Sequence, residues 1–150
     1  MAKGKSIVVG VDFSEVSNRA LSYALELAEG LHARVTVVHA YSLNAFNLPI
    51  EGAIISTAAQ ATQISEALQE KLDALLARHQ DAKVELHGSL RLGQAYEEVI
   101  AVAEEQDAEL IVIGTHGRRG AAHALMGSVA ERIVRMAERP VLTIPASATG

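Results

Sequence analysis

Short apolar runs alternate along this chain with longer stretches whose apolar residues recur at helical spacing. The runs expected to form strands cover residues 7–11, 35–39, 84–88, 110–113 and 140–145. The amphipathic stretches expected to form helices lie within residues 14–31, 64–76, 93–103 and 128–137. Such alternation is typical of the α/β class, in which a parallel sheet is covered by helices on both faces. We therefore predict a Rossmann-like sheet of five parallel strands.

The length and composition predict a single domain. The chain has 150 residues, and no internal repeat or break in composition divides residues 1–150. Its core is expected to be aliphatic, because the chain has three tyrosines, two phenylalanines and no tryptophan. Residues 41–56 are expected to form a loop, since asparagine, proline and glycine recur there.

The net charge and the composition argue against several classes of function. A net charge of −5 and a pI near 5.6 disfavour a nucleic-acid-binding protein. The absence of cysteine excludes disulfides and thiolate metal sites. No apolar run approaches the roughly 20 residues of a membrane span, and no signal-peptide pattern is present. A cytoplasmic protein without membrane insertion is the expectation.

The strongest functional motif follows the strand predicted at 110–113. It reads Gly114-Thr-His-Gly117, then nine residues, then Gly127-Ser128 at the start of the next helix. Glycines after a strand allow a sharp turn, and backbone amides at a helix N-terminus attract phosphate. The motif predicts a phosphate-binding loop. The alternative is that these glycines serve tight turns only.

A second polar position, Asp12, follows the first strand. Ligands of parallel α/β sheets sit in a crevice at the carboxyl ends of the strands, where the strand order reverses. Asp12 is therefore a candidate ribose ligand, although it can instead accept N–H bonds from the following turn. Ser14 and Ser17 are both able to cap the next helix. Arg118 is a candidate donor to the outer phosphates, with a solvated loop tip as the equal alternative.

A metal site and a catalytic site are both disfavoured. The six histidines are scattered over different elements, and His39 is expected to be a buried, hydrogen-bonded structural residue. The loop lacks the Gly-Lys-Ser/Thr of a P-loop, and the fourth strand ends in Gly114 rather than in an acidic residue. We expect no catalytic residues, and nucleotide binding without efficient turnover. Weak hydrolysis, assisted by Arg118 and a bridging metal ion, is left open.

Taken together, these residues resemble the ATP-binding branch of the universal stress protein family. The resemblance rests on G-x-x-G-x(9)-G-(S/T) at residues 114–128, on the opening segment 7–14, on His39-Ala40 and on residues 139–144. It covers essentially the whole chain. It implies the adenine nucleotide alpha hydrolase-like fold, with strand order 3-2-1-4-5.

The resemblance also implies which residues contact ATP. Gly10, Val11, Asp12 and Ala40 would line the base and ribose, Ile113 and Gly114 would flank the ribose and phosphates, and Gly117, Gly127, Ser128 and Val129 would wrap the phosphates. Mg²⁺ would bridge the phosphates. Members of the family commonly form homodimers through the last strand, here Val141 to Ile144. That segment is short, apolar and terminal, which by itself predicts an exposed sheet edge.

The sequence therefore predicts a cytoplasmic, homodimeric ATP-binding protein of the stress response. In this hypothesis ATP orders residues 115–127 and changes the surface presented to an unidentified regulatory protein partner. Two alternatives belong to other classes of function. One is a slow ATPase or phosphotransferase, and the other is an interaction module that needs no ATP or holds another ligand such as a cyclic nucleotide.

Overall fold

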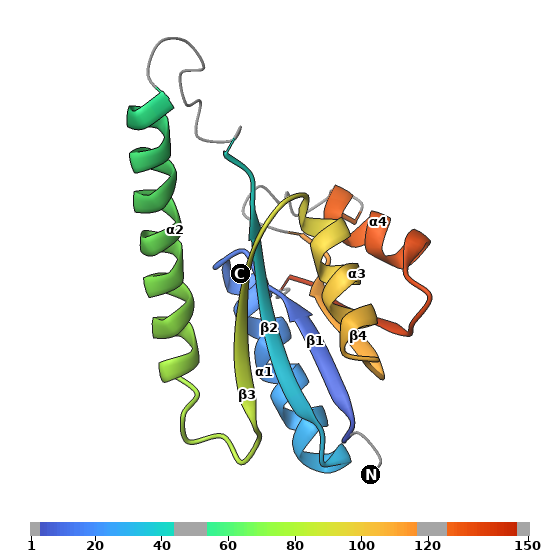
Figure 1. The fold of residues 1–150 in the computed structure, drawn as a ribbon. Helices are drawn as coiled ribbons and strands as arrows, with labels where there is room; N and C mark the ends of the chain where they lie inside the picture. The colour runs from blue at the N-terminus through green and yellow to red at the C-terminus, as the bar shows by residue number, and fades with distance from the viewer. Residues whose placement is uncertain (1–3, 44–53, 117–125, 147–150) are drawn as a thin grey trace.

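Five parallel strands and four helices form an α/β sandwich in the computed structural model, which describes residues 4–43, 54–116 and 126–146, without the side chains of 54–57. The sheet has the order β3-β2-β1-β4-β5 (Figure 1). Its strands are β1 (Ser6–Gly10), β2 (Arg34–Tyr41), β3 (Leu86–Leu92), β4 (Leu110–Gly114) and β5 (Val141–Ile144). The helices are α1 (Glu15–Leu31), α2 (Ile54–Ala77), α3 (Ala95–Glu105) and α4 (Ser128–Met136). The predicted fold class and strand order are confirmed.

Helices cover both faces of the sheet, as the alternation predicts. Successive side chains of a strand point to opposite faces, so Ile7 and Val9 of β1 pack with α1 and α2, whereas Val8 packs with α3 and α4. All three are fully buried. The two cores are built almost wholly from valine, isoleucine, leucine and alanine. This continuous aliphatic burial accounts for the unbroken apolar runs of the central strands.

The strand order reverses between β1 and β4. β1 pairs with β2, where Gly10 lies opposite Val38, and on its other side with β4, where Val9 lies opposite Val112. The chain runs outward from β1 to β3 and then returns across β1 to β4. The carboxyl ends of β1 and β4 therefore form the switch point at which sheets of this type bind ligands.

The largest differences from the sequence prediction lie at the start of α2 and at β3. Helix α2 begins at Ile54, so the loop predicted for residues 41–56 is too long at its carboxyl end. Strand β3 spans Leu86–Leu92 and not 84–88. This edge strand pairs with β2 alone, and its α2 side packs so closely that a Cβ at Gly88 would lie 2.8 Å from Leu76 Cδ1. In Figure 1 the N-terminal part of α2 extends beyond the end of β3.

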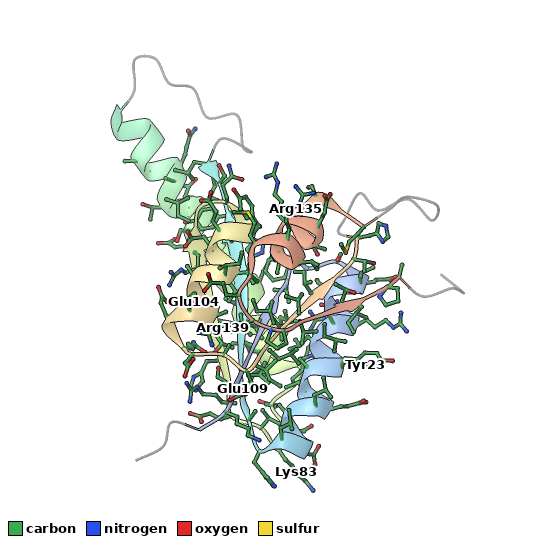
Figure 2. The ribbon with its side chains drawn as sticks, turned by 90° about the vertical axis from the view of Figure 1, so that its right-hand side faces the viewer. Tyr23, Lys83, Glu104, Glu109, Arg135 and Arg139 are labelled. Carbon is green, nitrogen blue, oxygen red and sulfur yellow. The ribbon has the colours of Figure 1, made fainter. Side chains whose placement is uncertain are left out.

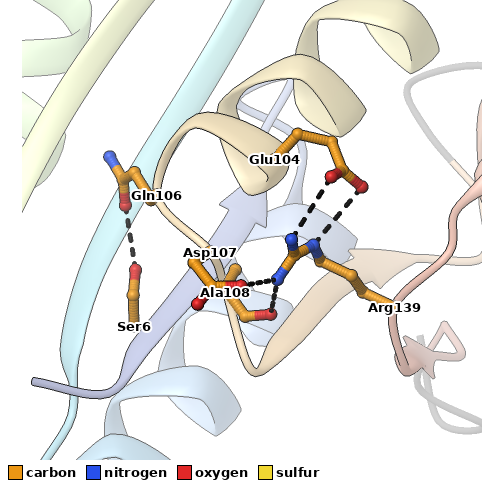
Figure 3. A network of polar contacts seen from close by, with 6 residues as sticks. All are labelled: Ser6, Glu104, Gln106, Asp107, Ala108 and Arg139. Atoms are coloured by element: carbon orange, nitrogen blue, oxygen red, sulfur yellow. Dashed lines mark hydrogen bonds and ion pairs between the residues drawn. The ribbon is translucent and has the colours of Figure 1, made fainter. Parts of the chain in front are cut away.

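Polar contacts fix the amino-terminal edge of the sheet. Gln106, directly after α3, accepts hydrogen bonds through Oε1 from the buried hydroxyls of Ser6 and Thr36, each at 2.9 Å. Arg139, just before β5, binds Glu104 through Nε and Nη2 and donates through Nη1 to Asp107 and to the Ala108 carbonyl (Figure 3). The hydrogen bonds to Glu104 and then Asp107 raise the pKa of the Arg139 guanidinium.

No helix in the described ranges is long and apolar enough to cross a membrane.

Candidate functional site

The predicted site residues that the structure describes gather around the switch point. Asp12 follows β1, Thr115 follows β4, and the register of these neighbouring strands places the two residues at the same level. The Val11 amide extends the ladder by donating to the Val38 carbonyl at 2.8 Å, and the Thr115 amide donates to the Ile144 carbonyl at 2.9 Å. We name this region, comprising residues 10–13, 114–116 and 126–129, the switch-point site. Half-buried Ala40, the penultimate residue of β2, lies beside it.

The turn between β1 and α1 holds the Asp12 carboxylate. Its Oδ1 atom accepts a hydrogen bond from the Ser14 amide at 3.0 Å, and the Asp12 amide donates to Ser17 Oγ at 3.3 Å. Ser14 is the N-cap of α1, because its hydroxyl oxygen accepts from the Ser17 amide. Asp12 therefore takes part in the turn through one oxygen, which is the alternative role that the sequence left open. The carboxylate is half-buried beside the ends of β1 and β4.

His39 and Phe13 pack together next to this turn. His39 Nδ1 lies 2.8 Å from the Val11 carbonyl oxygen, which fixes that nitrogen as the N–H donor. Its ring centroid lies 4.5 Å from that of Phe13. The predicted hydrogen bond of His39 is thus present, although the residue is half-buried and not fully buried. Both backbone groups of Val11 have partners, and its side chain lies in the core beside α1.

Steric contacts require glycine at two of the predicted positions. A Cβ on Gly114 would lie 2.5 Å from Val16 Cγ1 of α1, and one on Gly10 would lie 2.8 Å from Ile113 Cδ1. Ile113 itself is buried against α3 and α4. These glycines therefore permit close packing of the strands with their neighbours. The side chains of Ile113 and Val11 are buried, with 8% and 7% of their surface exposed.

The N-terminus of α4 provides the clearest polar feature of the site. Gly127 is the N-cap, with φ −62° and ψ 160°, and it makes no side-chain cap hydrogen bond to the first turn. Ser128 is the first helical residue, and both Ser128 and Val129 are exposed. The Gly127 amide donates to the Thr115 carbonyl, so its N–H group is already used. The amides of Ser128 and Val129 open the helix, where the dipole favours an anion.

Three sequence predictions in the glycine loop fall outside the described residues, namely Gly117, Arg118 and the course of residues 117–125. At the edge of that segment, Thr115 Oγ1 and His116 Nδ1 lie 3.0 Å apart. The bond between Thr115 and Gly127 brings the two flanks of the loop together. The described flanks of the loop thus lie side by side at the carboxyl end of β4.

Arg91, a cation near the carboxyl edge, is occupied in ion pairs. Arg91 of β3 binds Glu98 and Glu105 of α3 at 3.1 and 2.9 Å. These hydrogen bonds, Glu105 first, raise the pKa of the Arg91 guanidinium. No group of three His, Asp or Glu side chains able to hold a metal ion occurs within residues 4–43, 54–116 and 126–146.

Sequence reasoning missed two residues that touch the site's turn. Phe13 adopts φ +65°, and Lys71 of α2 places Nζ 5.7 Å from the centroid of the Phe13 ring. Only the position of Phe13 between Asp12 and Ser14 gave a signal in the sequence. Lys71 gave none, since any polar helix face carries such residues.

Comparison with known proteins identifies a family and relatives for this chain. The profile of the Universal stress protein family matches residues 4–145. The universal stress protein MJ0531 of Methanocaldococcus jannaschii is 33% identical over 141 residues, which cover 93% of this chain and 81% of that protein.

Two solved structures have similar sequences and folds. A protein from the universal stress protein family of Burkholderia pseudomallei is 32% identical with a TM-score of 0.71, and the match covers 97% of this chain and 99% of that one. The universal stress protein from Archaeoglobus fulgidus in complex with dAMP is 27% identical with a TM-score of 0.65, over 95% and 99% of the two chains. A relative of this chain has thus been solved in complex with an adenine nucleotide.

Proposed function

Because this chain belongs to the universal stress protein family, we propose that it binds ATP at the switch-point site and acts as a nucleotide-dependent regulator in a stress response. The observation that carries the proposal is the N-terminus of α4. It has no side-chain cap, and the bond between Gly127 and Thr115 attaches it to the end of β4. The end of β4 lies beside the end of β1, where Asp12 is held. Amide donors for the phosphates and a carboxylate for the ribose would thus belong to one region.

In this proposal each part of the nucleotide meets a different element. The adenine lies near Ala40 and the backbone of residues 10–11, and the ribose hydroxyls meet Asp12. The phosphates reach the amides of Ser128 and Val129, together with Gly117 and Arg118 of the loop. The relative's complex with dAMP supports an adenine nucleotide as the ligand class.

Magnesium would arrive with the nucleotide. The described residues form no cluster of three metal-ligating side chains, and Asp12 Oδ1 is engaged with the Ser14 amide. The phosphate oxygens and water would therefore hold most of the coordination shell of Mg²⁺. In this proposal, ion and nucleotide together stabilise one arrangement of the glycine loop, and a regulatory partner recognises that arrangement.

We further propose a cytoplasmic homodimer that pairs through β5.

A competition experiment tests the ligand and its identity. The protein is incubated with equal amounts of ATP, ADP, AMP and cyclic AMP in the presence of Mg²⁺, desalted rapidly and denatured, and the released nucleotide is identified by mass. We expect ATP to be enriched over the other three. Retention of none above a heat-denatured control would contradict nucleotide binding, and preference for cyclic AMP would favour a different ligand. Phosphate release in the same samples, measured against a sample without protein, separates binding from hydrolysis.

A further inference from the structure

The backbone at Phe13 is unusual for a position before a helix. Its φ of +65° lies in the left-handed region, where a bulky side chain is disfavoured. Two other non-glycine residues of the described chain have a positive φ, namely His32 and Asp107. His32 is the C-cap of α1, and Asp107 follows the C-cap of α3. The left-handed conformation is common after helices, but Phe13 precedes one.

The side chain of Phe13 is held from two elements. On one side its ring packs against His39 of β2, with the planes tilted by 43°. His39 is in turn fixed to the end of β1 by its hydrogen bond with the Val11 carbonyl. From α2, the Lys71 ammonium lies 5.7 Å from the ring centroid, within the range of a cation–π contact. Phe13 also packs against the buried core formed with α1 and α2.

These contacts maintain a backbone conformation that the residue would otherwise disfavour. Phe13 is the central residue of the turn that the Asp12 carboxylate closes by accepting from the Ser14 amide. Rotation of Phe13 out of the left-handed region would move the Ser14 amide away from Asp12 Oδ1. The direction of the carboxylate thus depends on the conformation of Phe13. Strain held by surrounding contacts is frequent at ligand sites.

We infer that Phe13 is a positioning residue of the nucleotide site, which orients the Asp12 carboxylate toward the nucleotide and links it to α2 through Lys71. This inference rests on the proposed function. It adds that Asp12 is effective only while the Phe13 ring keeps its contacts with His39 and Lys71. Lys71 brings α2 into contact with the site, although this helix supplies no predicted ligand-binding residue.

The test measures Kd for Mg-ATP by calorimetry in the wild type and in Phe13→Ala, Asp12→Ala and the double variant. Phe13→Ala is expected to weaken ATP binding about tenfold, which is the factor that loss of a well-placed hydrogen bond to a charged group would give. It should weaken binding no further in the Asp12→Ala background, because Phe13 acts through Asp12. Phe13→Tyr keeps the ring and should restore the wild-type affinity.

A second ligand separates positioning from general loss of structure. If Asp12 holds the ribose hydroxyls, the wild type should prefer ATP over 2′,3′-dideoxy-ATP, and Phe13→Ala should lose that preference. A partly unfolded protein would bind both ligands less well without changing their ratio. Tyr23→Ala is the matched control, since Tyr23 also lies under a cation, Arg19, but is 44% exposed on the outer side of α1 (Figure 2). This control should bind ATP normally.

The outcomes distinguish the two proposals. A wild type that binds no ATP refutes the proposed function, and the role of Phe13 with it. A wild type that binds ATP, with a folded Phe13→Ala variant of equal affinity, refutes the role of Phe13 alone. Equal losses from Phe13→Ala with and without Asp12 would also overturn it, because they would show a contribution independent of that carboxylate. Should Phe13→Ala fail to fold by circular dichroism, Phe13→Leu and Lys71→Met take its place in the same cycle.

Discussion

Gly114 shows how one missing methyl group sets the distance between α1 and β4. A Cβ there would lie 2.5 Å from Val16 Cγ1, closer than packed carbon atoms approach. The sequence motif directed attention to a ligand, but the contact that demands glycine comes from a helix almost a hundred positions earlier in the chain. No local pattern could have predicted it. Ligand loss on changing Gly114 would therefore not by itself identify a ligand contact.

The first prediction concerns this contact. Gly114→Ala is expected to lower the free energy of unfolding by about 1–3 kcal/mol, the usual cost of overpacking. Val16→Ala removes the clashing atom, so the double variant should be more stable than the sum of the two single effects predicts. Urea titrations of the four proteins measure this coupling. Strict additivity would show that the methyl group is accommodated elsewhere.

A second residue-scale prediction concerns pH. Burial first, and then the nearby charge of Arg78, lower the pKa of His79 in the folded protein from its ordinary value of 6.5. Below about pH 6.5 the unfolded chain therefore binds a proton at this residue more readily than the folded chain does. The wild type should lose stability relative to His79→Leu as the pH falls from 6.5, until the lowered pKa is passed.

Chemical denaturation of the wild type and His79→Leu between pH 8 and pH 5 tests the direction of this change in stability. The other histidines are present in both proteins, so their titration cancels in the difference. A difference in stability that stays constant over this range would contradict the lowered pKa of His79.

At the scale of elements, the sequence predicted the central structure better than the edges. Apart from Ser6, strands β1 and β4 are apolar, and their central residues are buried on both faces, so the sequence pattern predicted them. Strand β3 ends in residues that do not form part of the apolar core. Arg91 pairs with Glu98 and Glu105 of α3, and Leu92 is 58% exposed. A half-covered edge strand carries no continuous apolar signal, which is why its predicted bounds were wrong.

The candidate site likewise has features that the sequence predicted and features that it did not. Gly114, Gly127, Asp12 and Ser128 were predicted from local motifs, and the parallel topology places them at one end of the sheet. The cap arrangement at α4, the left-handed Phe13 and the approach of Lys71 arise from tertiary contacts. These features depend on packing between segments far apart in the sequence, which spacing along the chain does not encode.

The element-scale prediction concerns Gln106, which links β1, β2 and the end of α3. Its Oε1 atom accepts from the buried hydroxyls of Ser6 and Thr36. Gln106→Leu would leave both hydroxyls without this acceptor and is expected to cost about 1–3 kcal/mol of stability. Adding Ser6→Ala and Thr36→Val removes the unpaired hydroxyls and should recover much of the loss. Thermal unfolding of both variants decides this, and a triple variant no more stable than Gln106→Leu would contradict the explanation.

At the scale of the whole molecule, β5 forms one edge of the sheet and has β4 as its neighbour. The carbonyls of Pro140 and Ile144 accept from β4, so alternation directs the backbone groups of Val141 and Thr143 outward. Pro145 also faces outward by this alternation but has no N–H group. The proposed pairing between two copies would therefore be short and centred on two residues.

The corresponding prediction is that Thr143→Pro disrupts the dimer while leaving the fold intact. Proline removes an outward N–H group without removing a bond to β4. Light scattering should give a dimer for the wild type and a monomer for Thr143→Pro, with similar circular dichroism for the two proteins. A wild-type monomer at micromolar concentration would contradict pairing through β5, and a dimeric Thr143→Pro would indicate that another surface forms the dimer.

The central claim is that the first-turn amides of α4 bind the phosphates of ATP, and one substitution at Ser128 tests it most directly. Proline is favoured at the first helical position, and Gly127 already has the extended backbone that a following proline requires. Ser128→Pro thus keeps α4 but removes an amide, whereas Ser128→Ala removes only the hydroxyl. Calorimetric titration with Mg-ATP should show binding at least about fivefold weaker for Ser128→Pro than for Ser128→Ala. Equal affinity of the two variants would contradict phosphate binding at this helix.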